Sequence, residues 1–390
     1  MNLESIDKSY VLQTYARNYV NFVKGDGAKL YSEDGKEYID FTSGIGVVSV
    51  GHANKQVADA ICDQVHKITH ISNLYLIEPQ AKLAKKIVTL SGLDAGVFFA
   101  NSGAEANEGA LKIARKYGEV DGEIKRYKVI TLENSFHGRT ISTLKATGQS
   151  SMHNYFGPFP DGFVYAKDLD EIESLLDDHT IAVMIELVQG EGGVEPLDKQ
   201  KVQALAKLLK RKDILLIVDE VQTGVYRTGK FLASNYYEIE PDIVTLAKGL
   251  GGGVPIGAVM TTKKDVLKAG DHGSTYGGNY LVTRASLEVL SILEKEDLSK
   301  TIELFSKKLE ELAGKFPSFI QKSVGVGLMR GLRINKSETL TAIINKSFEE
   351  GVLVLKAGRN TLRFLPPLTI SKDEIEEGFK RVEKAFIALS

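Results

Sequence analysis

The chain has 390 residues, of which 43% are hydrophobic and 26% are charged, and Cys62 is its single cysteine. This composition is that of a globular protein large enough for two or three domains, and one cysteine excludes an internal disulfide and fits a reducing compartment such as the cytoplasm. The net charge of −2 gives no electrostatic basis for binding nucleic acid or an anionic membrane. No apolar run approaches the ~20 residues of a membrane-spanning helix, and no secretory signal is expected at the start of the chain.

The first 50 residues are expected to form an N-terminal segment of short strands at 29–31 and 38–41, joined by a turn at 32–35. From residue 51 to 290, apolar segments alternate with helical patterns, which predicts a large α/β domain with a mostly parallel sheet. The predicted strands are residues 96–100, 128–132, 163–166, 182–187, 214–218, 243–247 and 256–261, and the helices include residues 104–117 and 199–211.

The pattern changes near residue 295, where a smaller α+β domain over residues 291–390 is predicted. No linker marks the boundary, so we expect it within a long helix at residues 284–295. The N-terminal segment is expected to pack with this smaller domain. Its predicted elements are a helix at 297–316, a strand at 325–334, a helix at 338–349, strands at 352–355 and 361–365, and a helix at 372–388.

The first motif follows the predicted strand at 96–100, where a small-residue turn leads into a helix. Ser102 and Glu105 have the spacing of a capping box. The free N–H groups and dipole at such a helix start could bind a phosphate, although an ordinary capped turn explains the same pattern.

Asp219, Glu220 and Lys248 follow two further apolar strands. Ligands of open α/β sheets bind at the carboxyl ends of the strands, although an aspartate there can also simply cap the next turn. Most lysines are solvated, but Lys248 is expected at the same sheet edge as Asp219, with a glycine-rich loop beside it. A lysine held there could form a Schiff base.

Three weaker motifs are expected at the same edge. Phe136, His137 and Arg139 could stack on a flat ligand and bind a carboxylate, although a structured surface turn is the alternative. Residues 186–193 place two acids among glycines, and residues 272–279 form a hydroxyl-rich loop that could donate to phosphate. Their shared position at successive strand ends favours a common site.

Three other kinds of site are disfavoured. Residues 224–231 approach the Walker A spacing, but Phe231 stands where a hydroxyl must hold magnesium. No Gly-x-Gly-x-x-Gly motif is present, which disfavours a nucleotide-dependent dehydrogenase as the alternative class of enzyme. His66 and His70 lie four residues apart without a further ligand at metal-binding spacing, so no metal site is predicted.

A phosphate site, a Schiff-base lysine, a strand-end acid and a stacking aromatic together describe a pyridoxal 5′-phosphate site. The lysine amine can move the proton between substrate and cofactor. The acid would keep the pyridine nitrogen protonated, which makes the ring a better electron sink.

The sequence resembles the class III aminotransferases, which have the fold-type I pyridoxal phosphate architecture. The resemblance runs from about residue 15 to 386 and is carried by five motifs in the family's order. These are Asn-Ser-Gly-Ala-Glu-Ala-Asn, Phe-His-Gly-Arg-Thr, Gln-Gly-Glu-Gly-Gly, Asp-Glu-Val-Gln-Thr-Gly and Ala-Lys-Gly-Leu-Gly-Gly-Gly. The resemblance implies a large domain with a mostly parallel seven-stranded sheet, a smaller C-terminal domain and a homodimer with shared active sites.

Among members of the family, the sequence is most similar to those that move the ω-amino group of N2-acetylornithine to 2-oxoglutarate in arginine biosynthesis. Ornithine, succinylornithine and succinyl-diaminopimelate are the alternative donors. Two positions depart from the family pattern: Ala104 replaces a Thr or Ser, and Tyr280 begins a run in which proline is more usual.

The resemblance also assigns roles in binding the cofactor. Lys248 would bind it covalently, Asp219 would pair with the pyridine nitrogen, and Gln222 would reach the phenolic oxygen. Phe136 would stack on the ring, and Thr275 would bind the phosphate of the partner subunit. The remaining cofactor-binding residues implied are Ser102, Gly103, Ala104, Glu220 and Val221.

The resemblance assigns substrate binding to four residues. Arg363 would bind the α-carboxylate, while Arg139 and Ser274 would contact the acetylated substrate. Glu191 would pair with Arg363 whenever no second carboxylate is present. This switch would admit both an ω-amine donor and a dicarboxylate acceptor.

Overall fold

One large sheet organises the middle of the chain in this computed structural model, which describes residues 2–120 and 122–390. Its strands are all seven of those predicted from the sequence, with ends displaced by at most two residues. Most neighbours are parallel, but β14 runs antiparallel to both of its neighbours. The order is β4 (Gly96–Ala100), β14 (Gly257–Thr261), β13 (Ile243–Leu246), β12 (Leu215–Asp219), β9 (Thr180–Ile185), β7 (Lys128–Leu132) and β8 (Phe163–Ala166).

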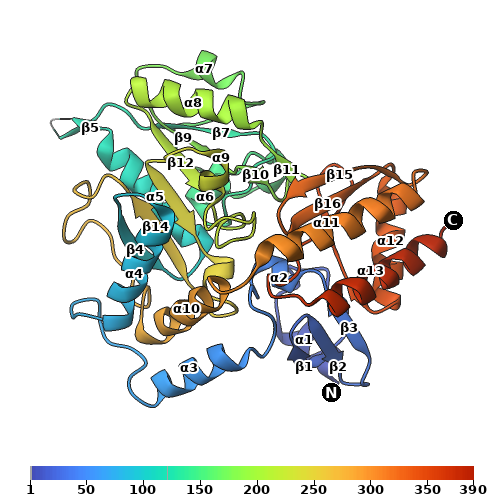
Figure 1. The fold of residues 1–390 in the computed structure, drawn as a ribbon. Coiled ribbons are helices and arrows are strands. Elements are labelled where there is room, and N and C mark those ends of the chain that lie inside the picture. Colours follow the sequence, from blue (N-terminus) through green and yellow to red (C-terminus); the bar gives the residue numbers. More distant parts are fainter. Residues whose placement is uncertain (1, 121) are drawn as a thin grey trace.

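Helices cover both faces of this sheet (Figure 1). Leu215 and Ile217 of β12 pack with residues of α5 (Gly103–Tyr117). Leu216 and Val218 pack on the other face with residues of α8 (Lys199–Arg211). Burial of both faces explains why β12 is apolar without alternation. Next to the β4 edge, α10 (Tyr280–Leu293) packs against α3 (Lys55–Val65) and α4 (Glu78–Ser91).

The C-terminal part is built on a second, antiparallel sheet in the order β15 (Ile320–Val326), β16 (Met329–Ile334), β19 (Thr361–Phe364) and β18 (Leu355–Ala357). The prediction of one strand over residues 325–334 is wrong, because Gly327 adopts a φ of 62° and turns the chain into the β15–β16 hairpin. The predicted strand at 352–355 is likewise divided between two sheets. The helices of this part are α11 (Leu298–Lys315), α12 (Ser337–Glu349) and α13 (Lys372–Ile387).

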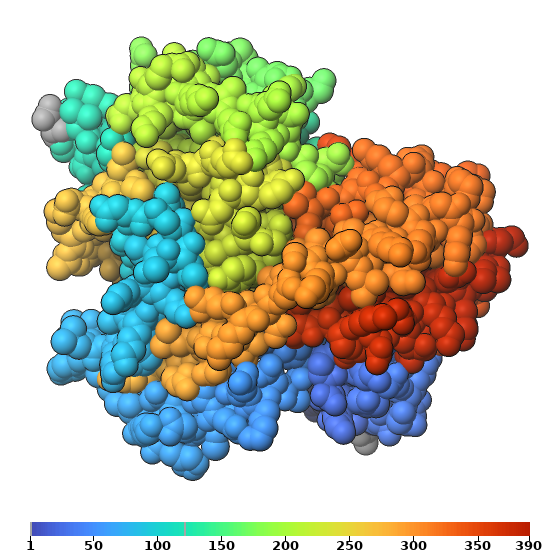
Figure 2. Space-filling model, viewed as in Figure 1, coloured from blue at the N-terminus to red at the C-terminus, as the bar shows by residue number. Residues whose placement is uncertain are grey.

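The N-terminal segment shares a sheet with the C-terminal part, in the order β1 (Phe22–Asp26), β2 (Lys29–Ser32), β3 (Glu37–Asp40) and β17 (Val352–Leu353). Phe41 packs between the N-terminal segment and the C-terminal part, since the centre of its ring lies 5.4 Å from the centres of both the Phe305 and the Phe379 rings. In Figure 2 the dark blue segment accordingly lies against the red C-terminal residues. The sequence did not indicate α1 (Leu3–Tyr10), which has no buried residue.

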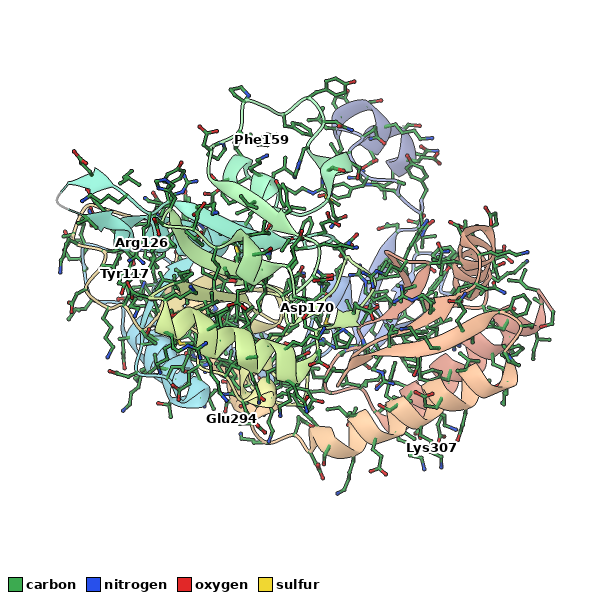
Figure 3. All side chains as sticks on the ribbon, turned by 90° about the horizontal axis from the view of Figure 1, so that it is seen from above. Tyr117, Arg126, Phe159, Asp170, Glu294 and Lys307 are labelled. Carbon is green, nitrogen blue, oxygen red and sulfur yellow. The ribbon has the colours of Figure 1, made fainter. Side chains whose placement is uncertain are left out.

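The domain limits at residues 50 and 290 stay a prediction, and α10 runs across the second of them. Figure 3 shows the large sheet and the C-terminal sheet from above, with Glu294 at the end of α10 and Lys307 on α11. Within the described residues, none of the helices has the length and apolar character needed to cross a membrane.

Candidate active site

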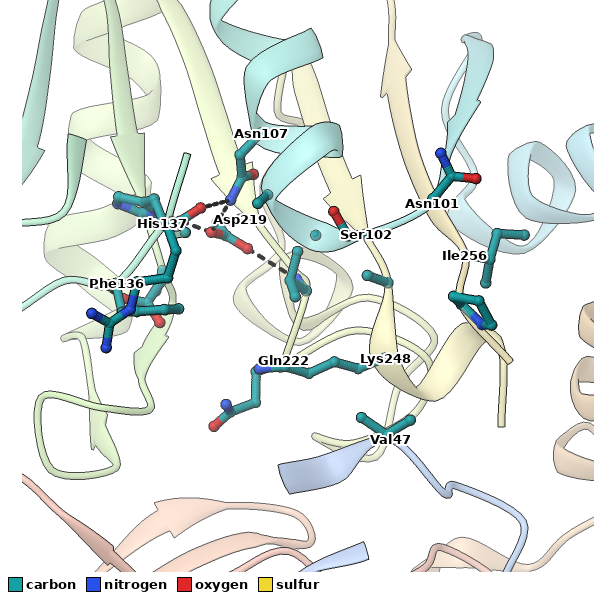
Figure 4. Close-up of a pocket in the computed structure, with 18 of the residues that line it drawn as sticks. Val47, Asn101, Ser102, Asn107, Phe136, His137, Asp219, Gln222, Lys248 and Ile256 are labelled. Atoms are coloured by element: carbon teal, nitrogen blue, oxygen red, sulfur yellow. Dashed lines mark hydrogen bonds and ion pairs between the residues drawn. The ribbon is translucent and has the colours of Figure 1, made fainter. Parts of the chain in front are cut away.

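A cavity of about 400 Å³ lies at the carboxyl ends of the central strands (Figure 4). It brings together most of the site residues predicted from the sequence. Glu220, Ser274, Thr275 and Arg363 are not among the residues that line it. The predicted residues that do line it are Ser102, Gly103, Ala104, Phe136, Arg139, Glu191, Asp219, Val221, Gln222 and Lys248.

Asp219 is the buried acid at the end of β12, with 4% of its surface exposed. Its Oδ2 accepts hydrogen bonds from Asn107 Nδ2 and from His137 Nδ1, both at 2.8 Å. Its Oδ1 accepts from the backbone N–H of Val221 at 3.0 Å, so the aspartate also caps the turn that follows it. The carboxylate is therefore held in one orientation at the edge of the cavity.

One of these partners, Asn107, was not assigned a role from the sequence, whereas His137 was expected at this edge only in a turn that could stack on a flat ligand and bind a carboxylate. Asn107 lies one helical turn beyond Gly103, on the side of α5 that faces the same sheet edge, which is the signal that could have found it. His137 Nδ1 donates to Asp219 because a carboxylate can only accept. Its Nε2 is buried without a hydrogen-bond partner among the described residues.

Lys248 follows β13 and is held in a strained backbone conformation, with a φ of 42°. Non-glycine residues in this region persist only where the surroundings enforce the conformation. Burial, and next the nearby guanidinium of Arg363, lower the pKa of the Lys248 amine, while Asp219 and Glu191 act in the opposite direction. A larger neutral fraction makes the amine a better nucleophile.

The start of α5 presents backbone N–H groups to the cavity. Ser102 caps the helix, accepting from the N–H of Glu105 at 3.2 Å. The predicted capping box is only half formed, because the Glu105 carboxylate accepts from the N–H of Asn101 at 2.6 Å instead of from Ser102. A Cβ on Gly103 would lie 2.7 Å from Cγ1 of Val221, so glycine is required for this approach.

Phe136 is fixed by a second acid that sequence analysis left without a role. Its N–H donates to Oε2 of Glu186 at 2.9 Å, and the guanidinium of Arg139 lies 5.6 Å from the centre of its ring. Glu186 directly follows Ile185, which pairs with Val218, so the carboxyl lies beside Asp219 across the sheet. Burial raises the pKa of Glu186 to about 7, and the charge of Asp219 adds to this effect.

The substrate-binding residues predicted by resemblance occupy different surroundings. Arg363 of β19 is 3% exposed, and its Nη1 donates to Oε1 of Glu191 at 2.7 Å. Ser274 Oγ accepts from Asn101 Nδ2 at 3.2 Å, which ties it to the rim of the cavity. Thr275 is exposed.

Glu220 differs from its predicted role in cofactor binding. Both of its carboxylate oxygens accept hydrogen bonds at the start of α9 (Ala233–Tyr237), from the N–H groups of Ala233 and Ser234 and from the Ser234 hydroxyl, each at 2.7 Å. Its surroundings therefore indicate that it holds a helix rather than a ligand.

Comparison with known proteins identifies the family. The family model for aminotransferase class-III matches residues 11–386. The chain is a class-III aminotransferase. It is 60% identical, over 98% of both chains, to a protein named acetylornithine aminotransferase from Wolinella succinogenes. It is 46% identical to one of the same name from Methanocaldococcus jannaschii, over 99% of this chain and 98% of that one.

Solved structures of similar fold agree. The ornithine aminotransferase from Toxoplasma gondii superposes with a TM-score of 0.93 at 35% identity, covering 99% of this chain and 94% of that one. The N-acetylornithine aminotransferase from Stenotrophomonas maltophilia superposes with a TM-score of 0.84 at 32% identity, covering 99% of both chains. The predicted fold, a fold-type I transferase with a mostly parallel seven-stranded sheet, is confirmed.

The aminotransferase depends on pyridoxal 5′-phosphate, and the cavity fits this cofactor. Its volume lies within the range of about 300–1,000 Å³ that is usual for small-ligand sites. It combines a half-buried lysine, a buried aspartate and a helix start at Gly103 that packs so closely on Val221 that a Cβ would not fit. The missing hydroxyl at Ala104 leaves its backbone N–H as the donor that this position can offer.

Proposed function

We propose that the enzyme transfers the ω-amino group of N2-acetyl-L-ornithine to 2-oxoglutarate, giving N-acetyl-L-glutamate 5-semialdehyde and L-glutamate, a step of arginine biosynthesis. The observation that carries the proposal is the ion pair between Arg363 and Glu191, whose charges both act on Lys248. The similar proteins named acetylornithine aminotransferase support the choice of donor.

The bound cofactor would supply the carbonyl carbon that takes up the amino group. Its ring would also accept the electrons that remain when the substrate carbon loses its proton. Lys248 Nζ would move the proton between substrate and cofactor, and its lowered pKa keeps part of the amine neutral for that task. Asp219 would hold a proton on the ring nitrogen, in the orientation that Asn107 and His137 fix. Phe136 would cover one face of the ring.

The two halves of the reaction need different charges at Arg363. An acceptor dicarboxylate presents its α-carboxylate near the reacting carbon, where Arg363 can bind it with a bidentate fork. For an ω-amine donor, an unpaired guanidinium there would attract the donor's own carboxylate and present the wrong amine. Pairing with Glu191 at 2.7 Å neutralises Arg363 in that half-reaction, while Arg139 and Ser274 hold the acetylated end.

A panel of donors tests the substrate. We expect N2-acetylornithine to give the highest kcat/KM with 2-oxoglutarate, ahead of ornithine, succinylornithine and succinyl-diaminopimelate. Succinyl-diaminopimelate is the alternative donor with direct support, since a protein from Buchnera aphidicola that is 42% identical is named acetylornithine/succinyldiaminopimelate aminotransferase. A higher kcat/KM for any of the three would replace the proposed donor.

We also propose that the enzyme works as a cytoplasmic homodimer with shared active sites. The exposed segment with Leu74 and Leu76 lies beside the loop that carries Thr275, because Asn73 Nδ2 donates to the carbonyls of Ser274 and Gly277 at 3.0 Å. Leu74 and Leu76 are 86% and 95% exposed. Exposed apolar side chains gathered at one place are typical of an interface, and the free Cys62 fits a reducing compartment.

Complementation tests the shared site. An inactive Lys248→Ala chain mixed with an inactive Thr275→Ala chain should place both lesions in one site of the heterodimer and leave the other intact. Partial recovery of activity is expected. A mixture that stays inactive although heterodimers form would show that Thr275 serves its own chain.

A further inference from the structure

Arg227 is a buried guanidinium outside the cavity. It lies in the loop between β12 and α9, with 2% of its surface exposed. No carboxylate pairs with it among the described residues, and its Nη2 is buried without a partner there. Burial lowers the pKa of Arg227 to about 9. Burying an unpaired guanidinium costs free energy, so Arg227 is expected to have a role other than keeping the surface soluble.

Its one pair of side-chain hydrogen bonds reaches the C-terminal sheet. Nη1 donates to the carbonyl oxygens of Leu328 at 3.1 Å and of Pro366 at 2.6 Å. In the β16–β19 ladder Arg330 pairs with Phe364, so Leu328 and Pro366 face each other two positions further on in the same antiparallel register. Arg227 therefore clamps the two strands together just beyond the end of their ladder.

The backbone around Arg227 is shaped for this contact. Val225 and Tyr226 have φ values of 54° and 66°, which are unfavourable for β-branched and aromatic residues. The carbonyl of Arg227 accepts from the N–H of Leu328 at 2.9 Å. A Cβ on Gly327 would lie 2.5 Å from that carbonyl oxygen, so the hairpin turn meets the loop at close range. Strain of this kind persists where the surroundings enforce it, often near functional sites.

The clamp joins the two halves of the active site. Arg227 follows the Asp219–Gln222 run of the cofactor side by five residues, and Pro366 follows Arg363 by three. Leu365, which lies between Arg363 and Pro366, is held by two hydrogen bonds. Its N–H donates to the carbonyl oxygen of Phe41, and its own carbonyl accepts from Ser43 Oγ at 2.6 Å. The Arg227 guanidinium thus links the chain just after Arg363 to the cofactor side, while Thr361 at the start of the same strand donates from its Oγ1 to the carbonyl of Gly193 at 3.2 Å.

We propose that Arg227 is a positioning residue, which sets the place of Arg363 relative to Lys248 and thereby governs binding of the acceptor's α-carboxylate. This rests on the proposed role of Arg363. Lysine keeps the charge, but its ammonium is more strongly hydrated and sits on a flexible stem, so it should hold the two carbonyls less firmly than the rigid, planar guanidinium does. A residue with a merely structural role would affect both half-reactions alike.

The test is single-turnover kinetics of both half-reactions in the Arg227→Lys holoenzyme. The apparent dissociation constant for 2-oxoglutarate should rise about 10-fold, which corresponds to ~1.4 kcal/mol. The rate and affinity of the N2-acetylornithine half-reaction should stay within about twofold, by the same scale. Gly327→Ala should give the same split, because the added Cβ would push the hairpin from the loop while leaving the guanidinium in place.

Arg330→Lys is the matched control. Arg330 lies on β16, next to the β19 strand that carries Arg363, but its side chain bonds to Ser306 and Glu310 on α11, so no split is expected. Equal losses in both half-reactions, or a split that Arg330→Lys reproduces, would overturn the proposal. An unchanged acceptor affinity in both Arg227→Lys and Gly327→Ala would overturn it too.

A double-mutant cycle with Arg363→Lys separates this inference from the proposed function. If Arg227 acts through Arg363, the two substitutions are non-additive in acceptor affinity. If Arg363→Lys weakens the binding of 2-oxoglutarate and Arg227→Lys does not, Arg227 is not a positioning residue and the proposed function stands. If Arg363→Lys leaves acceptor affinity unchanged, the proposed carboxylate site itself is wrong.

Discussion

The cofactor half and the substrate half of the proposed active site are built differently. Asp219 ends β12, and Glu186 and Lys248 follow β9 and β13 of the same sheet, so their backbones are fixed by its ladder. Arg363 belongs to the second sheet, and Glu191 follows the short strand β10 (Val188–Gln189). A site made by one sheet is rigid, whereas a site made by two parts can change its pairing between substrates. The cofactor half is thus suited to constant chemistry and the substrate half to alternation.

Removing Lys248 should affect the cofactor half most. Lys248→Ala is expected to lose nearly all turnover and the covalent link to the cofactor while keeping its fold, since only the amine is needed for both. Borohydride reduction followed by peptide mapping checks the assignment. Lys264→Ala, on an exposed ion pair with Asp94, is the control and should keep full activity. A cofactor adduct on any lysine other than Lys248 would refute the assignment.

Asp219→Asn should give the second largest loss. The amide keeps the shape of the side chain but not the charge that would hold the ring proton, so each half-reaction should slow by ~10²–10³-fold, the usual effect of removing one such stabilising group. Single-turnover rates at saturating cofactor measure the effect apart from affinity. Asp213→Asn removes a carboxylate that bonds to Tyr117 outside the cavity and should leave these rates unchanged. Near-normal rates in Asp219→Asn would show that the charge is not needed.

The same contrast explains what the sequence could predict. All seven strands of the large sheet and the residues at their ends followed from apolar runs, because burial on both faces leaves a strong pattern. The β15–β16 hairpin was missed because its turn rests on the φ of Gly327, a property that no hydrophobic pattern records. Asn107 was missed because, although it closes the motif at 101–107, it lies inside the helix rather than in the turn at the strand end.

Pairs that join distant parts of the chain were the least predictable from the residues alone. The Arg363–Glu191 pair joins positions 172 residues apart, and only the family resemblance suggested it. Glu220 shows the opposite error: its place beside Asp219 suggested a ligand, but successive side chains of a strand point to opposite faces. Its carboxylate accordingly faces α9.

Substitutions at the Arg363–Glu191 pair sharpen the picture of the substrate half. Arg363→Lys should weaken the 2-oxoglutarate half-reaction by ~10–100-fold, because lysine loses the bidentate fork, and should weaken the N2-acetylornithine half-reaction less. Glu191→Ala should shift donor preference toward α-amino donors such as glutamate, since Arg363 then stays unpaired. Single-turnover kinetics with each substrate measure both effects. Equal losses for Arg363→Lys together with an unchanged donor preference in Glu191→Ala would leave only a generic anion site.

Glu186→Gln should have the smallest effect. It tests whether burying the Glu186 carboxyl beside Asp219 destabilises the folded protein. Burial beside Asp219 raises the pKa of Glu186 to about 7 from the ordinary value of 4.5. Between these two values the unfolded chain binds fewer protons at this position than the folded protein does. The free energy of unfolding of the wild type therefore falls as the pH rises through this window.

Glutamine keeps the side-chain oxygen that accepts from the Phe136 N–H but cannot ionise. The free energy of unfolding of Glu186→Gln relative to wild type should therefore rise by about 1 kcal/mol between pH 6 and pH 8, as follows from a pKa shift of this size. Urea unfolding of the cofactor-free proteins at the two pH values measures the difference. Glu105→Gln is the control, because its carboxylate also accepts a backbone N–H but lies in an exposed turn. A difference in unfolding free energy that stayed constant between pH 6 and pH 8 would mean that Glu186 is already ionised in the folded protein at pH 6 and that burial does not raise its pKa.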